Sequence, residues 1–297
     1  QGAVAVTGCE MLPCPGAFYP QSIIDDVVIS CATDGNHGRS VAWGCQMFGC
    51  RCVIYIHQDV SMGREQAMQA LGAEVIRVEG NYDHSVKQAD IEAGYHQRII
   101  VSDTSYPGYM EIPKDVALGY TVMLAEAVEQ MQGTIPTHVF IQGGVGGLAA
   151  AVCAYFWELW GPQRPRFIVV EPEQANCLQQ SARARKPVAV EGDLDTLMAG
   201  LSCGEVSTLA WEILKHGAND FMTVSEDSVA PCMRMLAYGD PSIEAGESAV
   251  AGLAALIAAR DDATMSGALE LDQSSRVFVI GTEGATDVEL YRELVET

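Results

Sequence analysis

The sequence is poor in basic residues. Only 17 lysines and arginines stand against 39 aspartates and glutamates, which gives a formal net charge of −22. Nucleic-acid binding is therefore not expected, because phosphate backbones are bound by clustered lysine and arginine. The charge indicates a strongly acidic surface, and an anionic ligand would need a local positive site within this field.

Long apolar runs and paired cysteine motifs are also lacking. The best apolar window, residues 148–160, is interrupted by Glu158 and suits a buried helix, so no membrane span is expected. The first 20 residues have neither the basic segment nor the long apolar core of a signal peptide. The ten cysteines include a CxC at residues 50–52, at a predicted helix-to-strand junction, but no CxxC framework. We expect mostly buried, reduced thiols in a cytoplasmic protein, and no metal site.

Short β-branched apolar runs alternate with helix-like segments along the chain. This pattern predicts an α/β protein with parallel sheets and flanking helices. A hydrophobic content of 48% over 297 residues is enough for two lobes. We expect a smaller α/β lobe at residues 30–130, inserted into a larger α/β lobe made of residues 1–29 and 131–297. A cleft between the lobes would hold a small-molecule substrate.

Four loops follow the predicted strands and carry unusual residues. Open α/β sheets bind ligands beyond the carboxyl ends of their strands, so these loops are expected to gather around one site. They are TDGNHG (33–38), SDTSYPGY (102–109), QGGVGGLAAA (142–151) and GTEGATD (281–287).

The glycine-rich loop predicts a phosphate site. It lacks the GKS/T ending of a P-loop and fits GxGxxG only with an alanine at the last position. Its backbone N–H groups can converge on an anion, and the helix that follows adds its dipole. A tight turn that needs glycine only for packing is the alternative, and the density of glycine favours phosphate. The loop consists of Gly143, Gly144, Val145, Gly146 and Gly147.

Three polar residues of the other loops are candidates for catalysis: Asp34, His37 and Asp103. Asp34 lies in an Asp-Gly-Asn-His-Gly turn, where a buried carboxylate could act as a base near neutral pH. Aspartate is also a common turn residue. Asp103 could equally satisfy turn amides, and His37 could serve as a structural hydrogen-bonding group.

With these loops in this order, the chain resembles the diaminopropionate ammonia-lyases. These are fold type II pyridoxal-phosphate enzymes with a two-lobed, tryptophan synthase β-like architecture. The resemblance runs from about residue 27 to the C-terminus and implies α,β-elimination of ammonia from 2,3-diaminopropionate. The family is often dimeric, so a homodimer is also implied. The segments that carry it include ATDGNHGR, LGAEVI, NYDHSV, IVVEP, MAGLSCGE, GES and TEGATD.

The resemblance also implies roles for single residues around the cofactor. Asn36 would contact the phenolic oxygen of the pyridine ring, and the loop at residues 143–147 would hold the phosphate. Thr282 and Glu283 would lie near the pyridine nitrogen.

Further roles concern the substrate and the entrance to the site. The resemblance implies that Asp34 exchanges a proton with the substrate α-carbon and that Asp103 is a second active-site aspartate. It also implies that Cys177 and Cys203 can form a disulfide near the entrance.

The sequence departs from the family at its lysine. The family binds the cofactor covalently through a lysine upstream of the Asp-Gly-Asn-His-Gly turn. Residues 1–19 show no match to the family, which suggests a chain shortened at its N-terminus. The departure implies that pyridoxal phosphate is held without a covalent bond or not at all, and that the lyase reaction is impaired. All four lysines follow the turn: Lys87, Lys114, Lys186 and Lys215.

Two other functions remain open from the sequence. One is a cofactor-independent hydrolase of small carboxylic esters, which would use a cleft serine with His37 and Asp34. The GxSxG nucleophile motif is lacking. The other is a catalytically silent ligand-binding module. The serines near the predicted site are Ser30, Ser102, Ser105, Ser202 and Ser248.

Overall fold

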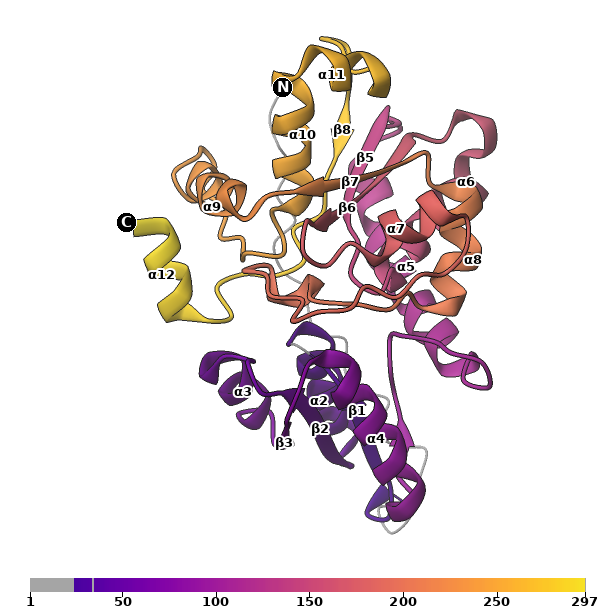
Figure 1. Cartoon of the computed structure of the whole chain (residues 1–297), viewed down its shortest axis with the longest axis vertical. Coiled ribbons are helices and arrows are strands. Elements are labelled where there is room, and N and C mark those ends of the chain that lie inside the picture. Colours follow the sequence, from indigo (N-terminus) through magenta and orange to yellow (C-terminus); the bar gives the residue numbers. More distant parts are fainter. Residues whose placement is uncertain (1–23, 34, 297) are drawn as a thin grey trace. The chain divides into compact units, whose positions relative to one another are not determined.

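The computed structural model describes residues 24–33 and 35–296. Packing divides these residues into two units (Figure 1). The small unit comprises residues 24–102 and Thr286–Glu289, and the large unit comprises residues 103–285 and 290–296. Asp34 lies outside the described residues, and so does the segment 1–19 that did not match the family.

The small unit is built on a parallel sheet with the strand order β3-β2-β1-β4. Strand and helix alternate along the chain, which is the order that the sequence predicts for parallel strands. Its elements are β1 (Val28–Ala32), α2 (Asn36–Phe48), β2 (Arg51–His57), α3 (Met62–Gln69), β3 (Glu74–Val78), α4 (Tyr82–His96) and β4 (Ile99–Ile100).

Strand β2 is the centre of the small unit's core. Its side chains alternate between the two faces of the sheet, as a strand requires. Ile54 and Ile56 pack in one apolar cluster with Ala42 of α2, whereas Tyr55 packs in another with Ala89 of α4. Both faces are therefore covered by helices, which explains why the strand is a nearly continuous apolar run.

The large unit is built on a second parallel sheet with the strand order β7-β6-β5-β8. Helix α12 (Val288–Glu296) begins in the small unit and ends in the large one. The other elements of the large unit are α5 (Glu111–Gln130), β5 (His138–Gln142), α6 (Gly147–Trp160), β6 (Arg166–Pro172), α7 (Cys177–Ala184), α8 (Thr208–Gly217), β7 (Asp220–Val224), α9 (Val229–Ala237), α10 (Ala251–Asp261), α11 (Ala263–Leu269) and β8 (Val277–Phe278), with short 3-10 helices at Gly161–Gln163, Ala199–Leu201 and Glu226–Ser228.

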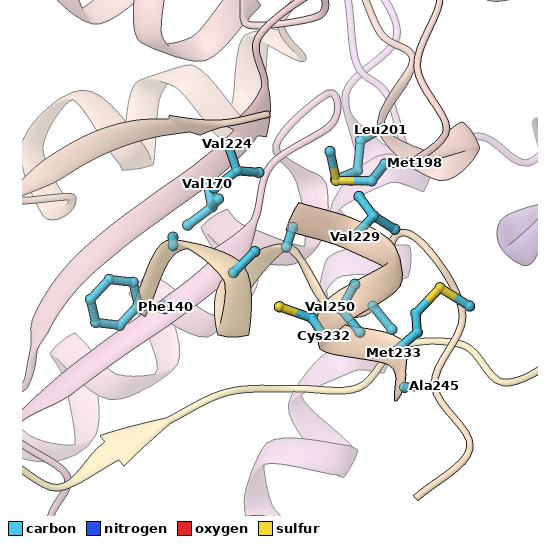
Figure 2. Packing of buried hydrophobic residues seen from close by; sticks show 14 of the residues in the cluster. Phe140, Val170, Met198, Leu201, Val224, Val229, Cys232, Met233, Ala245 and Val250 are labelled. Carbon is cyan, nitrogen blue, oxygen red and sulfur yellow. The ribbon is translucent and has the colours of Figure 1, made fainter. Parts of the chain in front are cut away.

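The core of the large unit lies on both faces of this sheet. On one face Phe140 and Val170 pack with Val229 of α9 and Val250, just before α10, as Figure 2 shows. On the other face, alternate residues of the same strands pack against α6 and α8. This double burial places the carboxyl ends of β5 and β6 at one rigid edge, where the loops begin.

The predicted α/β class, with two parallel sheets and flanking helices, is confirmed. Packing starts the large unit at residue 103 rather than at the predicted residue 131, because α5 packs against α6. Within the described part of the chain, no helix has the length and apolar character needed to cross a membrane.

Candidate functional site

The glycine loop joins β5 to α6. Gly143 N donates to Val170 O at 2.8 Å, which ties the start of the loop to β6. Gly144 and Gly146 have φ angles of +62° and +96°, a region that glycine adopts without steric cost. A Cβ at Gly146 would also lie 3.0 Å from Ala210 Cβ. The backbone path therefore requires glycine at these two positions.

Three helices begin at this loop. Helix α6 starts at Gly147, the last residue of the loop. At the start of α7, Cys177 Sγ donates to Gly144 O at 3.7 Å, and at the start of α8, Ser207 N donates to Val145 O at 2.9 Å. Each helix N-terminus carries a partial positive charge. An anion at this loop is therefore favoured locally, although the chain as a whole is strongly negative.

A buried carboxyl group lies beneath the loop. Glu171, at the end of β6, has no exposed surface and accepts hydrogen bonds from Leu178 N at 2.8 Å and Gln179 N at 2.7 Å. A Cβ at Gly143 would be 2.8 Å from its Cγ. Burial raises the pKa of Glu171 to about 8, although these donors and the Cys177 thiol lower it. The role of Glu171 was not predicted from the sequence. A glutamate within an apolar strand was the available signal.

Asp103 lies beside the glycine loop. Its backbone oxygen would be 3.0 Å from a Cβ at Gly147. Its Oδ1 is buried and has no hydrogen-bond partner among the described residues. Burial, and then the charge of Asp103, raise the pKa of Tyr120 on α5. A buried carboxylate oxygen without a donor is costly, so the arrangement suits a ligand that brings an N–H group.

A pair of serines fixes the loop that carries Asp103. Ser105 and Ser207 are buried, and their hydroxyl oxygens lie 2.8 Å apart. Ser207 Oγ accepts from Ser105 N at 3.0 Å, and Ser105 Oγ accepts from Leu209 N at 2.8 Å. These bonds attach the loop to the first turn of α8. Ser105, one candidate for a hydrolytic nucleophile, therefore has a structural role here.

The loop after β8 is tied to the end of β5. Gln142 Nε2 donates to Ile280 O at 3.0 Å and to Thr282 Oγ1 at 2.7 Å. Glu283 Oε1 accepts from Ser248 N at 2.8 Å. The large unit thus gathers Thr282 and Glu283 at the same sheet edge as the glycine loop. Their predicted contact with a pyridine nitrogen stays a prediction.

The two cysteines of the predicted disulfide both lie at Gly144. Cys177 bonds its carbonyl oxygen, and Cys203 Sγ would be 3.8 Å from a Cβ at this glycine. Both are buried, and both are in the thiol form. The structure therefore places them around one residue of the loop, and their disulfide stays a prediction.

In the small unit, Thr33 organises the Asp-Gly-Asn-His-Gly turn. Its buried Oγ1 accepts from Gly35 N at 3.0 Å and Gly38 N at 3.1 Å. Asn36 starts α2, and His37 Nε2 lies 2.8 Å from Val101 O. Whether His37 is catalytic or structural stays a prediction. The role of Asp34 stays a prediction, since that residue lies outside the described part of the chain.

Arg64 lies directly against this turn. Its guanidinium is almost fully buried, and a Cβ at Gly35 would collide with its Nη1. Gly35 has φ +153°, so the position also disfavours larger residues on conformational grounds. The roles of Thr33 and Arg64 were not predicted from the sequence. Thr33 lies in the TDGNHG loop but was given no role there, and Arg64 lies far from the turn along the chain.

Replacing Thr33 by valine is expected to lower the free energy of unfolding by about 2–4 kcal/mol. Valine keeps the shape but leaves two buried N–H donors without an acceptor, at ~1–3 kcal/mol each. Urea denaturation followed by circular dichroism measures the change. Thr121→Val is the matched control, because Thr121 is only partly buried and its hydroxyl donates to Leu118 O within its own helix. Equal urea midpoints for the two variants would contradict the role of Thr33.

The other candidate serines and two of the lysines are buried or bonded to nearby groups. Ser202 Oγ donates to Leu194 O at 2.7 Å, and Ser30 and Ser102 are buried. Lys114 Nζ lies 2.5 Å from Glu111 Oε1 and Lys215 Nζ lies 2.6 Å from Glu212 Oε2. Both ion pairs join residues three apart on exposed helix surfaces. Over residues 24–33 and 35–296, no group of three or more His, Cys, Asp or Glu could hold a metal ion.

The fold and these loops define an enzyme class. Residues 22–283 match the family of pyridoxal-phosphate dependent enzymes, so the chain belongs to that family. This confirms the resemblance inferred from the loops.

Several proteins of known activity or structure are similar to this chain. The diaminopropionate ammonia-lyase of Escherichia coli (strain K12) is 41% identical over 282 residues, covering 92% of this chain and 71% of the relative. The Salmonella typhimurium enzyme of the same name is 37% identical over 284 residues, covering 92% and 70%. The crystal structure of the holo E. coli enzyme aligns with a TM-score of 0.85 and 40% identity, covering 91% of this chain and 69% of that one. A threonine deaminase from Solanum lycopersicum, 20% identical with a TM-score of 0.74, shares the fold.

Proposed function

We propose that this chain binds pyridoxal phosphate at the carboxyl edge of its large sheet. We further propose that the site is built to eliminate ammonia from 2,3-diaminopropionate. The observation that carries the proposal is the convergence of α6, α7 and α8 on the glycine loop. The names of its relatives support the choice of cofactor and substrate. When bound, the cofactor supplies an electron sink for the bond-breaking steps.

The glycine loop would hold the phosphate. Its glycines leave the backbone open to close approach, and the helix N-termini supply the positive potential that a dianion needs. Glu171 supports this cradle from below by holding the first turn of α7 through two backbone N–H groups. These residues bind and orient the cofactor, and they take no part in the chemistry.

Asp103 would act on the substrate. A diamino acid brings two ammonium groups, and Asp103 Oδ1 is a buried acceptor that lacks a partner among the described residues. We propose that this oxygen hydrogen-bonds the leaving amino group of the substrate and that Asp103 returns to it the proton that it needs to depart as neutral ammonia. The reaction also needs a base for the α-proton, and the resemblance assigns that role to Asp34. Asn36 would orient the ring from the start of α2.

The positions of the four lysines bear on whether the cofactor would be bound covalently. Lys114 and Lys215 are paired with neighbouring glutamates on exposed helix surfaces. Lys87 lies on α4, and Lys186 follows α7. We therefore propose that the described residues hold the cofactor through phosphate and ring contacts rather than through a covalent bond.

Titration with cofactor analogues tests this binding. Isothermal calorimetry should show pyridoxal phosphate binding about 100-fold more tightly than pyridoxal, because one or two charge-assisted bonds to phosphate contribute ~1.5–3 kcal/mol each. Inorganic phosphate should compete with pyridoxal phosphate. Borohydride treatment followed by dialysis should leave no cofactor attached to the chain. Equal affinity for the two analogues would contradict a phosphate site in the loop.

A separate assay tests the reaction. Ammonia release from 2,3-diaminopropionate should depend on added pyridoxal phosphate, and Asp103→Asn should reduce it at least tenfold without changing cofactor affinity. General acid–base groups typically contribute more than this factor. Ester hydrolysis that persists without cofactor would favour the hydrolase alternative. Cofactor binding without either activity would favour the ligand-binding module.

A further inference from the structure

Three cysteines lie together in the small unit at the junction of α2 and β2. They are Cys45 in the last turn of α2, Cys50 after the helix and Cys52 at the start of β2. Cys45 and Cys52 are buried in the apolar cluster beneath α2, and Cys50 packs against it while remaining partly exposed. Neither the cofactor site nor the proposed reaction uses them.

The end of α2 explains why two of these cysteines meet. Gly49 has φ +76°, and its N–H bonds Cys45 O at 2.8 Å, while Cys50 N bonds the same oxygen at 3.1 Å. The six-residue bond from Cys50 back to Cys45 is the signature of a Schellman motif. A contact between the side chains at those two positions frequently accompanies this motif. Here both are cysteines.

The backbone at the end of α2 brings Cys45 and Cys50 together. Cys50 Sγ lies 3.9 Å from Cys45 O, and Cys45 and Cys52 pack in the same apolar cluster, with Cys50 against it. A disulfide needs Cα atoms roughly 4–7 Å apart, and the bond from Cys50 N to Cys45 O holds the two backbones close to each other. Cys50 is the cysteine of this cluster that a reagent can reach, because it alone of the three is partly exposed.

We propose that Cys50 and Cys45 form a thiol–disulfide exchange site that reacts with low-molecular-weight disulfides, next to the buried thiol of Cys52. Cys50 Sγ, as a thiolate, attacks one sulfur of the reagent and expels one thiolate, which takes up the proton that Cys50 has lost. Cys45 Sγ then attacks Cys50 Sγ and expels the second reagent thiolate, which takes up the proton of Cys45. The two cysteines lose two electrons and the reagent gains them. The product is a Cys45–Cys50 disulfide across the end of α2.

The surroundings set the speed of this reaction. Burial, and then the neighbouring Cys45, raise the pKa of Cys50 to about 11. The negative end of the α2 dipole acts in the same direction. The thiolate is the attacking form, so the rate of the first step should rise about tenfold for each pH unit between 7 and 9. The neighbouring Cys52, and then burial, also raise the pKa of Cys45, which slows the second step.

Peptide mapping of the full chain tests the proposal. The protein is incubated with oxidised glutathione, the remaining thiols are blocked with iodoacetamide, and the chain is digested with trypsin. Cleavage after Arg39 and Arg51 leaves Cys45 and Cys50 in one peptide and Cys52 in the next. The expected product is therefore a single peptide, residues 40–51, about two mass units lighter than its dithiol form. A link between the two peptides, or an unreacted residue 40–51 peptide, would overturn the proposal.

Two variants separate the steps. Cys45→Ala should leave glutathione attached to Cys50, because nothing then resolves the mixed disulfide. Cys232→Ala is the matched control, since Cys232 is a buried thiol of the large unit outside this cluster, and its map should equal that of the wild type. Cys52→Ala is a second test, for the case that Cys45→Ala does not fold. It should still form the disulfide within the residue 40–51 peptide, because Cys52 takes no part in the two steps. Loss of that disulfide in Cys52→Ala would overturn the proposed order of reaction.

Discussion

Replacing Gly146 by alanine is expected to lower the free energy of unfolding by about 2–4 kcal/mol and to abolish measurable binding of pyridoxal phosphate. The φ angle of +96° costs a side-chain-bearing residue ~1–2 kcal/mol. The added methyl would lie 3.0 Å from Ala210 Cβ and 3.3 Å from Leu178 Cδ2, and such overpacking costs ~1–3 kcal/mol. These neighbours belong to α8 and α7, so the methyl would push apart the helix starts that frame the loop.

Gly108→Ala is the matched control for this prediction. Gly108 has φ +93°, close to that of Gly146, but no atom lies within 4 Å of a Cβ built there. It should therefore show the conformational cost alone, ~1–2 kcal/mol, and retain cofactor affinity. Urea denaturation and calorimetric titration of both variants measure the two effects. Gly146→Ala should lose more stability than Gly108→Ala. An equal loss would show that close packing against α7 and α8 is not the reason for glycine at position 146.

The phosphate-binding role of the glycine loop could be predicted from the sequence alone. Four glycines between a strand and a helix of small residues predict a phosphate cradle, because only local geometry is involved. The order of the loops, and the segments around them, were sufficient to identify the family. The parallel sheets followed from short apolar runs, since strands buried on both faces cannot alternate polar and apolar residues.

Contacts between distant segments could not be predicted in this way. Glu171 bonds the start of α7, seven and eight residues later, and packs under Gly143, 28 positions earlier. The pair Ser105 and Ser207 joins loops 102 positions apart. Arg64 meets Gly35 only because α3 packs near the turn. The assignment of α5 to the large unit likewise depends on its packing against α6, which its own periodicity does not encode.

The pH dependence of stability should reveal the state of Glu171. Its pKa rises from 4.5 in the unfolded chain to about 8 in the folded one, so the unfolded chain loses its proton first as pH rises. The free energy of unfolding contributed by this group is therefore full below pH 4.5 and falls progressively up to about pH 8, where the folded carboxyl also ionises. The shift corresponds to a loss on the order of 5 kcal/mol.

Urea denaturation of Glu171→Gln between pH 5 and 9 isolates this contribution. Glutamine cannot ionise, so wild type minus variant should decline steadily with rising pH. Glu173→Gln is the control, since Glu173 is exposed and two residues away, and its curve should run parallel to wild type. A difference that instead grows with pH would mean that the bonds from Leu178 N, Gln179 N and the Cys177 thiol outweigh burial.

The protonation state of Glu171 should also affect cofactor binding. A neutral Glu171 beneath the glycine loop preserves the positive potential of the loop, whereas an ionised one opposes a phosphate dianion. Affinity for pyridoxal phosphate should therefore fall above pH 8 in the wild type and not in Glu171→Gln.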